Sequence, residues 1–94
     1  MNYQELNENE RMLFLVKQNK RLRIEENHNV KFVRVSEIAK ILNIIDIQIM
    51  EQVKDFGLDI TSSVTSINST INSNVAQIFI KFILENIDIE VIWA

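Results

Sequence analysis

The chain has 94 residues, 47% of them hydrophobic and 24% charged, which is enough for one small globular domain and too few for a second. It contains no cysteine, which excludes a disulfide scaffold, a thiolate metal site and a cysteine nucleophile. Its single glycine, Gly57, excludes a glycine-rich phosphate-binding loop. We therefore expect no bound nucleotide, no metal and no other cofactor.

The net charge of −3 is unevenly distributed. Residues 1–40 contain eight of the ten Lys and Arg residues and six of the thirteen Asp and Glu residues, so this part is about +2 and the rest about −5. Such a split suggests two faces with different partners. No apolar run reaches the roughly 18 residues of a membrane span, and no signal-peptide pattern is present, so we expect neither membrane insertion nor secretion.

Residues 4–18 are predicted to form the first helix. Asn7 or Asn9 can cap it, and Glu8 and Glu10 favour its positive N-terminal end. Residues 12–16 are apolar on all sides of this helix. We therefore expect the helix to lie between two neighbours or to bury a face against another protein.

Residues 20–35 allow two interpretations. Charged and apolar residues alternate at 20–25 and again at 30–35, with a turn-like segment between them, which is typical of a hairpin. Alternatively, the first helix continues to Ile24 and a single strand follows. The strand at 31–35 is expected in both cases.

The next two helices have clear signals at their ends. Ser36 is the expected N-cap of the first, and Asn43 ends it. Asp46 begins the second, which Gly57 closes in a left-handed conformation.

Ser, Thr and Asn dominate residues 61–74, where spaced β-branched residues favour a loop with extended segments pinned to the core. Asn72 caps a last amphipathic helix, and the alternation at 87–91 predicts a strand. This order predicts an α+β domain of three or four helices on a short sheet of two or three strands. We expect residues 1–30 to form an N-terminal helix with a basic extension, and residues 31–94 to form the helical domain.

Nothing in the sequence indicates catalysis. His28 is the only histidine and lies in a polar turn, and the serines cluster in a loop without a group that could activate a hydroxyl. We therefore expect a protein that is not an enzyme.

A basic cluster begins at the end of the first helix and continues beyond it. It is predicted to contact RNA phosphates, although charge runs are usually solvated helix ends. The expected RNA-binding residues are Lys17, Lys20, Arg21, Arg23 and Arg34, and Lys31 and Lys40 extend the cluster. The nearby Phe32 is expected to be buried by its strand, which disfavours base stacking.

The two central helices also suggest a DNA-binding helix-turn-helix. The outward positions of the second helix carry Asp46, Glu51 and Asp55, which would face phosphates. This charge disfavours DNA binding.

Three segments share a residue pattern with a known family. Val33–Leu42 reads VRVSEIAKIL, Val53–Gly57 reads VKDFG, and Ser66–Ile80 reads SINSTINSNVAQIFI. They resemble the V-x-E-L-A-x-x-L, K-x-x-G and I-N-x-x-(I/L)-D-x-E-T-A motifs of the small N-terminal-type domain of bacterial and organellar translation initiation factor two, the block before its GTPase domain. In that domain a strand, two helices, a strand and a third helix follow one another. The resemblance covers about residues 31–84 and consists mostly of hydrophobic spacing.

This resemblance implies a fold and an association with the translation apparatus, with a ribosome or ribosomal RNA as partner, in a bacterial cytoplasm or a plastid stroma. It implies neither GTP hydrolysis nor initiator-tRNA binding, because no residue here matches those sites. The sequence departs from the family in a longer loop after Gly57, in Asn72 at a capping aspartate, and in Lys81 and Phe82 at an acidic pair.

The leading hypothesis is therefore a non-catalytic, translation-associated module that binds RNA. The alternative is a protein–protein adaptor, or a small structural subunit of a large assembly, that reuses the same fold. Phe14, Phe82 and Trp93 are the expected partner-binding residues in that case, because aromatic side chains commonly anchor interfaces.

Overall fold

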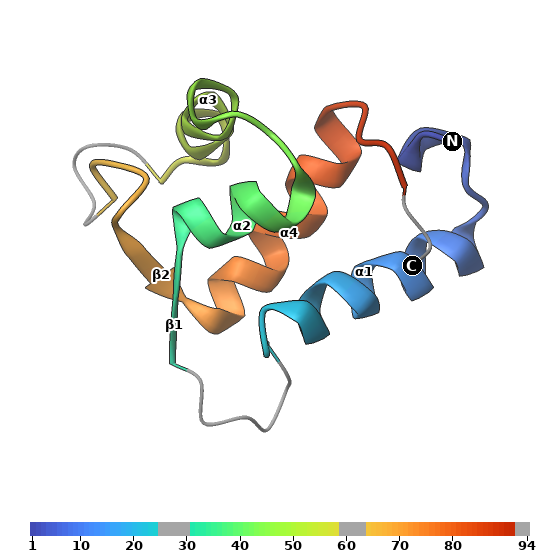
Figure 1. Ribbon diagram of the computed structural model, residues 1–94, viewed down its shortest axis with the longest axis horizontal. Helices are drawn as coiled ribbons and strands as arrows, with labels where there is room; N and C mark the ends of the chain where they lie inside the picture. The colour runs from blue at the N-terminus through green and yellow to red at the C-terminus, as the bar shows by residue number, and fades with distance from the viewer. Residues whose placement is uncertain (25–30, 59–63, 92–94) are drawn as a thin grey trace.

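The computed structural model describes residues 1–24, 31–58 and 64–91 (Figure 1). Four α-helices pack on a small two-stranded antiparallel sheet, which confirms the predicted α+β class. The elements in chain order are η1 (Tyr3–Glu5), α1 (Glu8–Arg21), β1 (Phe32–Arg34), α2 (Val35–Leu42), α3 (Asp46–Phe56), β2 (Thr70–Asn72) and α4 (Ser73–Asn86).

The sheet is a short ribbon with one buried face. Val33 pairs with Ile71 at its centre, and both side chains are buried, whereas their neighbours along each strand are exposed. This alternation is the side-chain period of a strand with one face on the core. The predicted strand at 31–35 is confirmed as Phe32–Arg34.

The hairpin interpretation of residues 20–35 is wrong. The first helix runs to Arg21, and residues 22–24 form a turn after it. The apolar side chains of Leu22 and Ile24 are buried in this turn. The alternation at 20–24 therefore reflects a helix end that presses two residues into the core. Residues 25–30 lie outside the described part of the chain.

The strand predicted at 87–91 is replaced by a short contact with the N-terminus. Asn2 and Glu90 form one isolated bridge, the Tyr3 N–H donates to the Ile89 carbonyl at 2.7 Å, and the Val91 N–H donates to the Met1 carbonyl at 2.8 Å. The pairing ends there because the chain turns into η1 at Tyr3.

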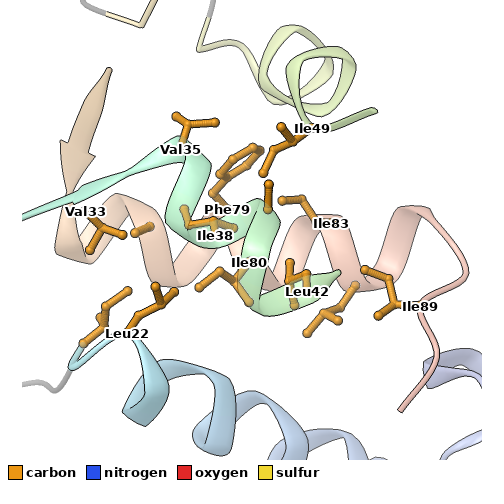
Figure 2. Close-up of a cluster of buried hydrophobic side chains, with 14 of the residues drawn as sticks. Leu22, Val33, Val35, Ile38, Leu42, Ile49, Phe79, Ile80, Ile83 and Ile89 are labelled. Atoms are coloured by element: carbon orange, nitrogen blue, oxygen red, sulfur yellow. The ribbon is translucent and has the colours of Figure 1, made fainter. Parts of the chain in front are cut away.

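The helix α4 is the centre of the core (Figures 1 and 2). It contacts η1, α1, α3 and both strands. Its buried residues are Ala76, Phe79, Ile80, Ile83 and Leu84. Phe14 and Leu22 of the N-terminal segment belong to the same apolar cluster, so residues 1–24 share one core with the rest of the described chain.

Two of the expected helix caps are present and one is not. The Asn7 side chain accepts from the Glu10 N–H at 2.9 Å while the Glu10 carboxylate accepts from the Asn7 N–H at 3.1 Å, so α1 begins at Glu8 rather than at residue 4. The Asn72 side chain caps α4 through the Asn74 N–H at 2.8 Å. Ser36 is not a cap, because α2 already begins at Val35.

Backbone carbonyls of the loop before β2 cap the N-terminus of α2. The Val35 N–H donates to the Ser69 carbonyl at 3.0 Å, and the Ser36 N–H donates to the Ile67 carbonyl at 2.8 Å. Helix N–H groups that a side chain would otherwise satisfy are thus satisfied by backbone from a distant part of the sequence. This contact also pins the segment before β2, as its β-branched residues predict.

The helices α1, α2 and α3 end in the same way. After each, a residue with positive φ is followed by an apolar residue whose N–H donates to a carbonyl of the last turn, as in a Schellman motif. The positive-φ residues are Arg23 (58°), Asn43 (57°) and Gly57 (97°). Asn43 and Gly57 confirm the predicted helix ends.

Candidate nucleic-acid interface

A hollow of about 360 Å³ lies where the end of α1 meets α2. Two arginines and a lysine line it together with one carboxylate and two apolar side chains. The lining residues are Arg21, Leu22, Arg23, Glu37, Lys40 and Ile41. We call the set Arg21, Arg23 and Lys40 the basic hollow.

The end of α1 positions the two arginines. The Arg23 N–H donates to the Lys20 carbonyl at 2.9 Å, and the Ile24 N–H donates to the Asn19 carbonyl at 2.7 Å. Ile24 is 2% exposed, so it anchors the turn in the core. The left-handed backbone of Arg23 lies between these bonds, and its exposed side chain forms part of the hollow.

The helix α2 supplies the third cation. Glu37, Lys40 and Ile41 follow one another at the spacing of a single helical face, and α2 packs against α1. The three cations are exposed and face one carboxylate, so the hollow carries a net positive charge. Guanidinium and ammonium groups form charge-assisted hydrogen bonds with phosphate, so this arrangement can bind a phosphate group.

The other predicted RNA-binding residues lie outside this hollow. Lys20 is exposed on α1, Lys17 is half-buried there, and Arg34 is exposed on β1. The structure thus brings Arg21 and Arg23 together with Lys40, which the sequence indicated only as an extension of the cluster. The spacing of Glu37, Lys40 and Ile41 on one helical face is the sequence feature that could have predicted the place of Lys40 in this hollow.

The burial predicted for Phe32 is wrong. Its side chain is 62% exposed, because the strand turns Val33 toward the core and leaves the residues on either side in solvent. Phe32 and Arg34 therefore share the outer face of the ribbon.

The residues predicted to anchor a protein partner are differently placed. Phe14 is only 3% exposed, and its ring centroid lies 5.8 Å from that of Tyr3, so it is a core residue and not a surface anchor. Phe82 is half-buried, and its ring centroid lies 5.1 Å from that of Phe56. Trp93, like His28, lies outside the described residues.

A second hollow, of about 520 Å³, lies between α1, η1 and α4. The Arg11 guanidinium carbon lies 5.4 Å from the centroid of the Tyr3 ring, and Arg11 Nη2 donates to the Gln4 carbonyl at 2.8 Å. Glu8, Glu85 and Lys81 also line it, so its charge is mixed. Burial raises the pKa of the Tyr3 hydroxyl, the Glu85 carboxylate raises it further, and Arg11 opposes both.

The surface of α3 is acidic. Asp46, Glu51 and Asp55 are exposed on it, with Lys54 as the one basic residue of the helix. A helix with this charge is repelled by DNA phosphates, which counts against its use as a recognition helix.

Comparison of the sequence with known protein families, with curated proteins and with solved structures found no match. Within residues 1–24, 31–58 and 64–91, no helix is long and apolar enough to cross a membrane. The same residues contain no group of three His, Asp or Glu side chains that could hold a metal ion.

Proposed function

We propose that this protein is a non-catalytic, translation-associated module that docks on a ribosome through RNA, in a bacterial cytoplasm or a plastid stroma. The observation that carries the proposal is the basic hollow, where α1 and α2 bring Arg21, Arg23 and Lys40 together. Three exposed cations at one place can neutralise the negative charges of an RNA backbone.

Two further features support this proposal. Residues 32–86 fold in the order strand, helix, helix, strand and helix, which is the order implied by the resemblance to the domain of translation initiation factor two. The exposed ring of Phe32, two residues from Arg34, offers a flat apolar surface to an unpaired base.

The proposal is tested by measuring the affinity for a short single-stranded ribosomal RNA segment as a function of salt. We expect the affinity to fall steeply with salt, because each neutralised phosphate releases counterions. The double variant Arg21→Gln/Lys40→Gln removes two of these contacts, and we expect the slope of log K against log salt to become shallower by about 1.4, at about 0.7 per contact.

Matched control variants exist on the other faces of the molecule. Lys54 on α3 and Lys81 on α4 are also exposed, so Lys54→Gln/Lys81→Gln changes the net charge by the same amount without touching the basic hollow. If the two double variants weaken RNA binding equally, the interaction is a general charge effect and the proposed site is wrong.

A further inference from the structure

The outer face of α1 carries an apolar strip that nothing in the described structure covers. Met12 is 61% exposed, Leu13 is 64% exposed and Val16 is 45% exposed, although the same helix buries Phe14 on its opposite face. Three large apolar side chains in one helical turn are more than the isolated exposed residues common on protein surfaces. This strip is therefore a candidate contact surface.

Charges at the two ends of α1 restrict what this surface can contact. Exposed Glu8 precedes the strip, and exposed Lys20 follows it. A second α1 laid against the first in the opposite direction would place each Glu8 near the Lys20 of the other copy. Antiparallel helix dipoles attract as well, whereas a parallel pair would bring like charges together. The strip is thus complementary to itself.

The second exposed apolar group lacks this property. Ile47 is 72% exposed and Ile45 is 68% exposed at the start of α3. The charged residues that line the same hollow as Ile47 are Asp46, Glu51 and Lys54, so this face carries a net negative charge. Two copies of that face would repel each other.

We propose that two copies of this chain associate through α1, related by a two-fold axis, with Leu13 of one copy packed against Val16 of the other. A two-fold contact requires a surface that is complementary to itself, and the apolar centre with opposite charges at its ends meets this requirement. The proposed contact involves only one helix face from each copy, and stable dimer interfaces bury roughly 1,200 Å² or more. The association is therefore weak and depends on protein concentration.

The test is sedimentation velocity of the full chain over a range of concentrations, in low salt and without RNA. We expect dimers at high concentration and monomers at low concentration. Leu13→Glu places charges in the apolar centre and is expected to weaken association at least tenfold. The matched control Ile47→Glu places the same charge at an equally exposed isoleucine on α3 and is expected to leave the association unchanged.

Charge reversal tests the orientation of the two helices. Glu8→Lys and Lys20→Glu are each expected to weaken the dimer, because each places like charges opposite one another. The double variant Glu8→Lys/Lys20→Glu restores opposite charges and is expected to recover most of the lost association. Glu8 and Lys20 are both exposed, and circular dichroism of each variant verifies that the fold is retained.

Two results would overturn this inference. One is a protein that stays monomeric at about 1 mM, where a contact with a Kd of about 1 mM would already hold about half of the chains in dimers. The other is a dimer that Ile47→Glu weakens as much as Leu13→Glu does, which would place the interface elsewhere.

Discussion

Arg23 occupies a backbone conformation that favours glycine. Its φ of 58° follows α1 at the position where helices commonly end in glycine. A left-handed conformation costs a residue with a Cβ about 1–2 kcal/mol. The sequence nevertheless places an arginine there, and this arginine forms one side of the basic hollow.

We predict that Arg23→Gly stabilises the fold while weakening RNA binding. The relief of left-handed strain is partly offset by the greater freedom of glycine in the unfolded chain, which leaves a net gain of about 0.5–1 kcal/mol in the free energy of unfolding. Urea denaturation measures the stability, and RNA titration measures the affinity. A variant that is less stable than the wild type would show that the Arg23 side chain makes a larger stabilising contribution than its backbone strain costs.

The raised pKa of Tyr3 predicts a loss of stability in alkali. The folded protein holds the phenolic proton more tightly than the unfolded chain, in which the pKa is about 10.0. The contribution of this pKa difference to the free energy of unfolding is therefore fully present below pH 10. It is lost as the pH rises through the folded-state pKa. Thermal melts between pH 8 and 11 measure it, and Tyr3→Phe should decline less steeply. Equal declines in the two proteins would contradict the prediction.

Single residues in an apolar run could not be assigned to core or surface from the sequence. Residues 12–16 are all apolar, and periodicity alone does not distinguish buried Phe14 from exposed Leu13. The burial expected for Phe32 is wrong for a related reason: both faces of β1 carry apolar residues, and only the packing of Val33 decides which face is inside.

At the level of whole elements, the boundaries set by local chemistry were predictable. Asn7, Asn43, Gly57 and Asn72 act on backbone within a few residues, and the structure confirms all four. Two of the errors concern distant partners. The start of α2 depends on carbonyls near residues 67–69, and residues 87–91 pair with the N-terminus, neither of which the local sequence reveals.

The common mode of helix termination predicts the effect of replacing the one glycine. Gly57 has a φ of 97°, and no heavy atom lies within 4 Å of the place its Cβ would occupy. Gly57→Ala should therefore lose about 1 kcal/mol through backbone strain alone, without a steric clash. Urea denaturation measures the loss. An unchanged stability would show that α3 can end in another way.

For the molecule as a whole, the N-terminal helix and the segment with the resemblance form one packed unit. The helix α1 contacts α2 and α4. Leu22 joins the central cluster around Phe79 and Ile80 (Figure 2), and Phe14 belongs to the same cluster. The basic hollow exists only because of this packing, since Arg21 and Lys40 belong to different helices. Both residues are evidently basic in the sequence, but only the tertiary contact between α1 and α2 places them together.

The most direct test of this account is co-sedimentation of the purified protein with bacterial ribosomal subunits through a sucrose gradient at low and at high salt. We expect the protein to travel with a subunit at low salt and to leave it at high salt. We expect Arg21→Gln/Lys40→Gln to stay at the top of the gradient in both. A wild-type protein that stays at the top at low salt, or a double variant that sediments with subunits as the wild type does, would contradict it.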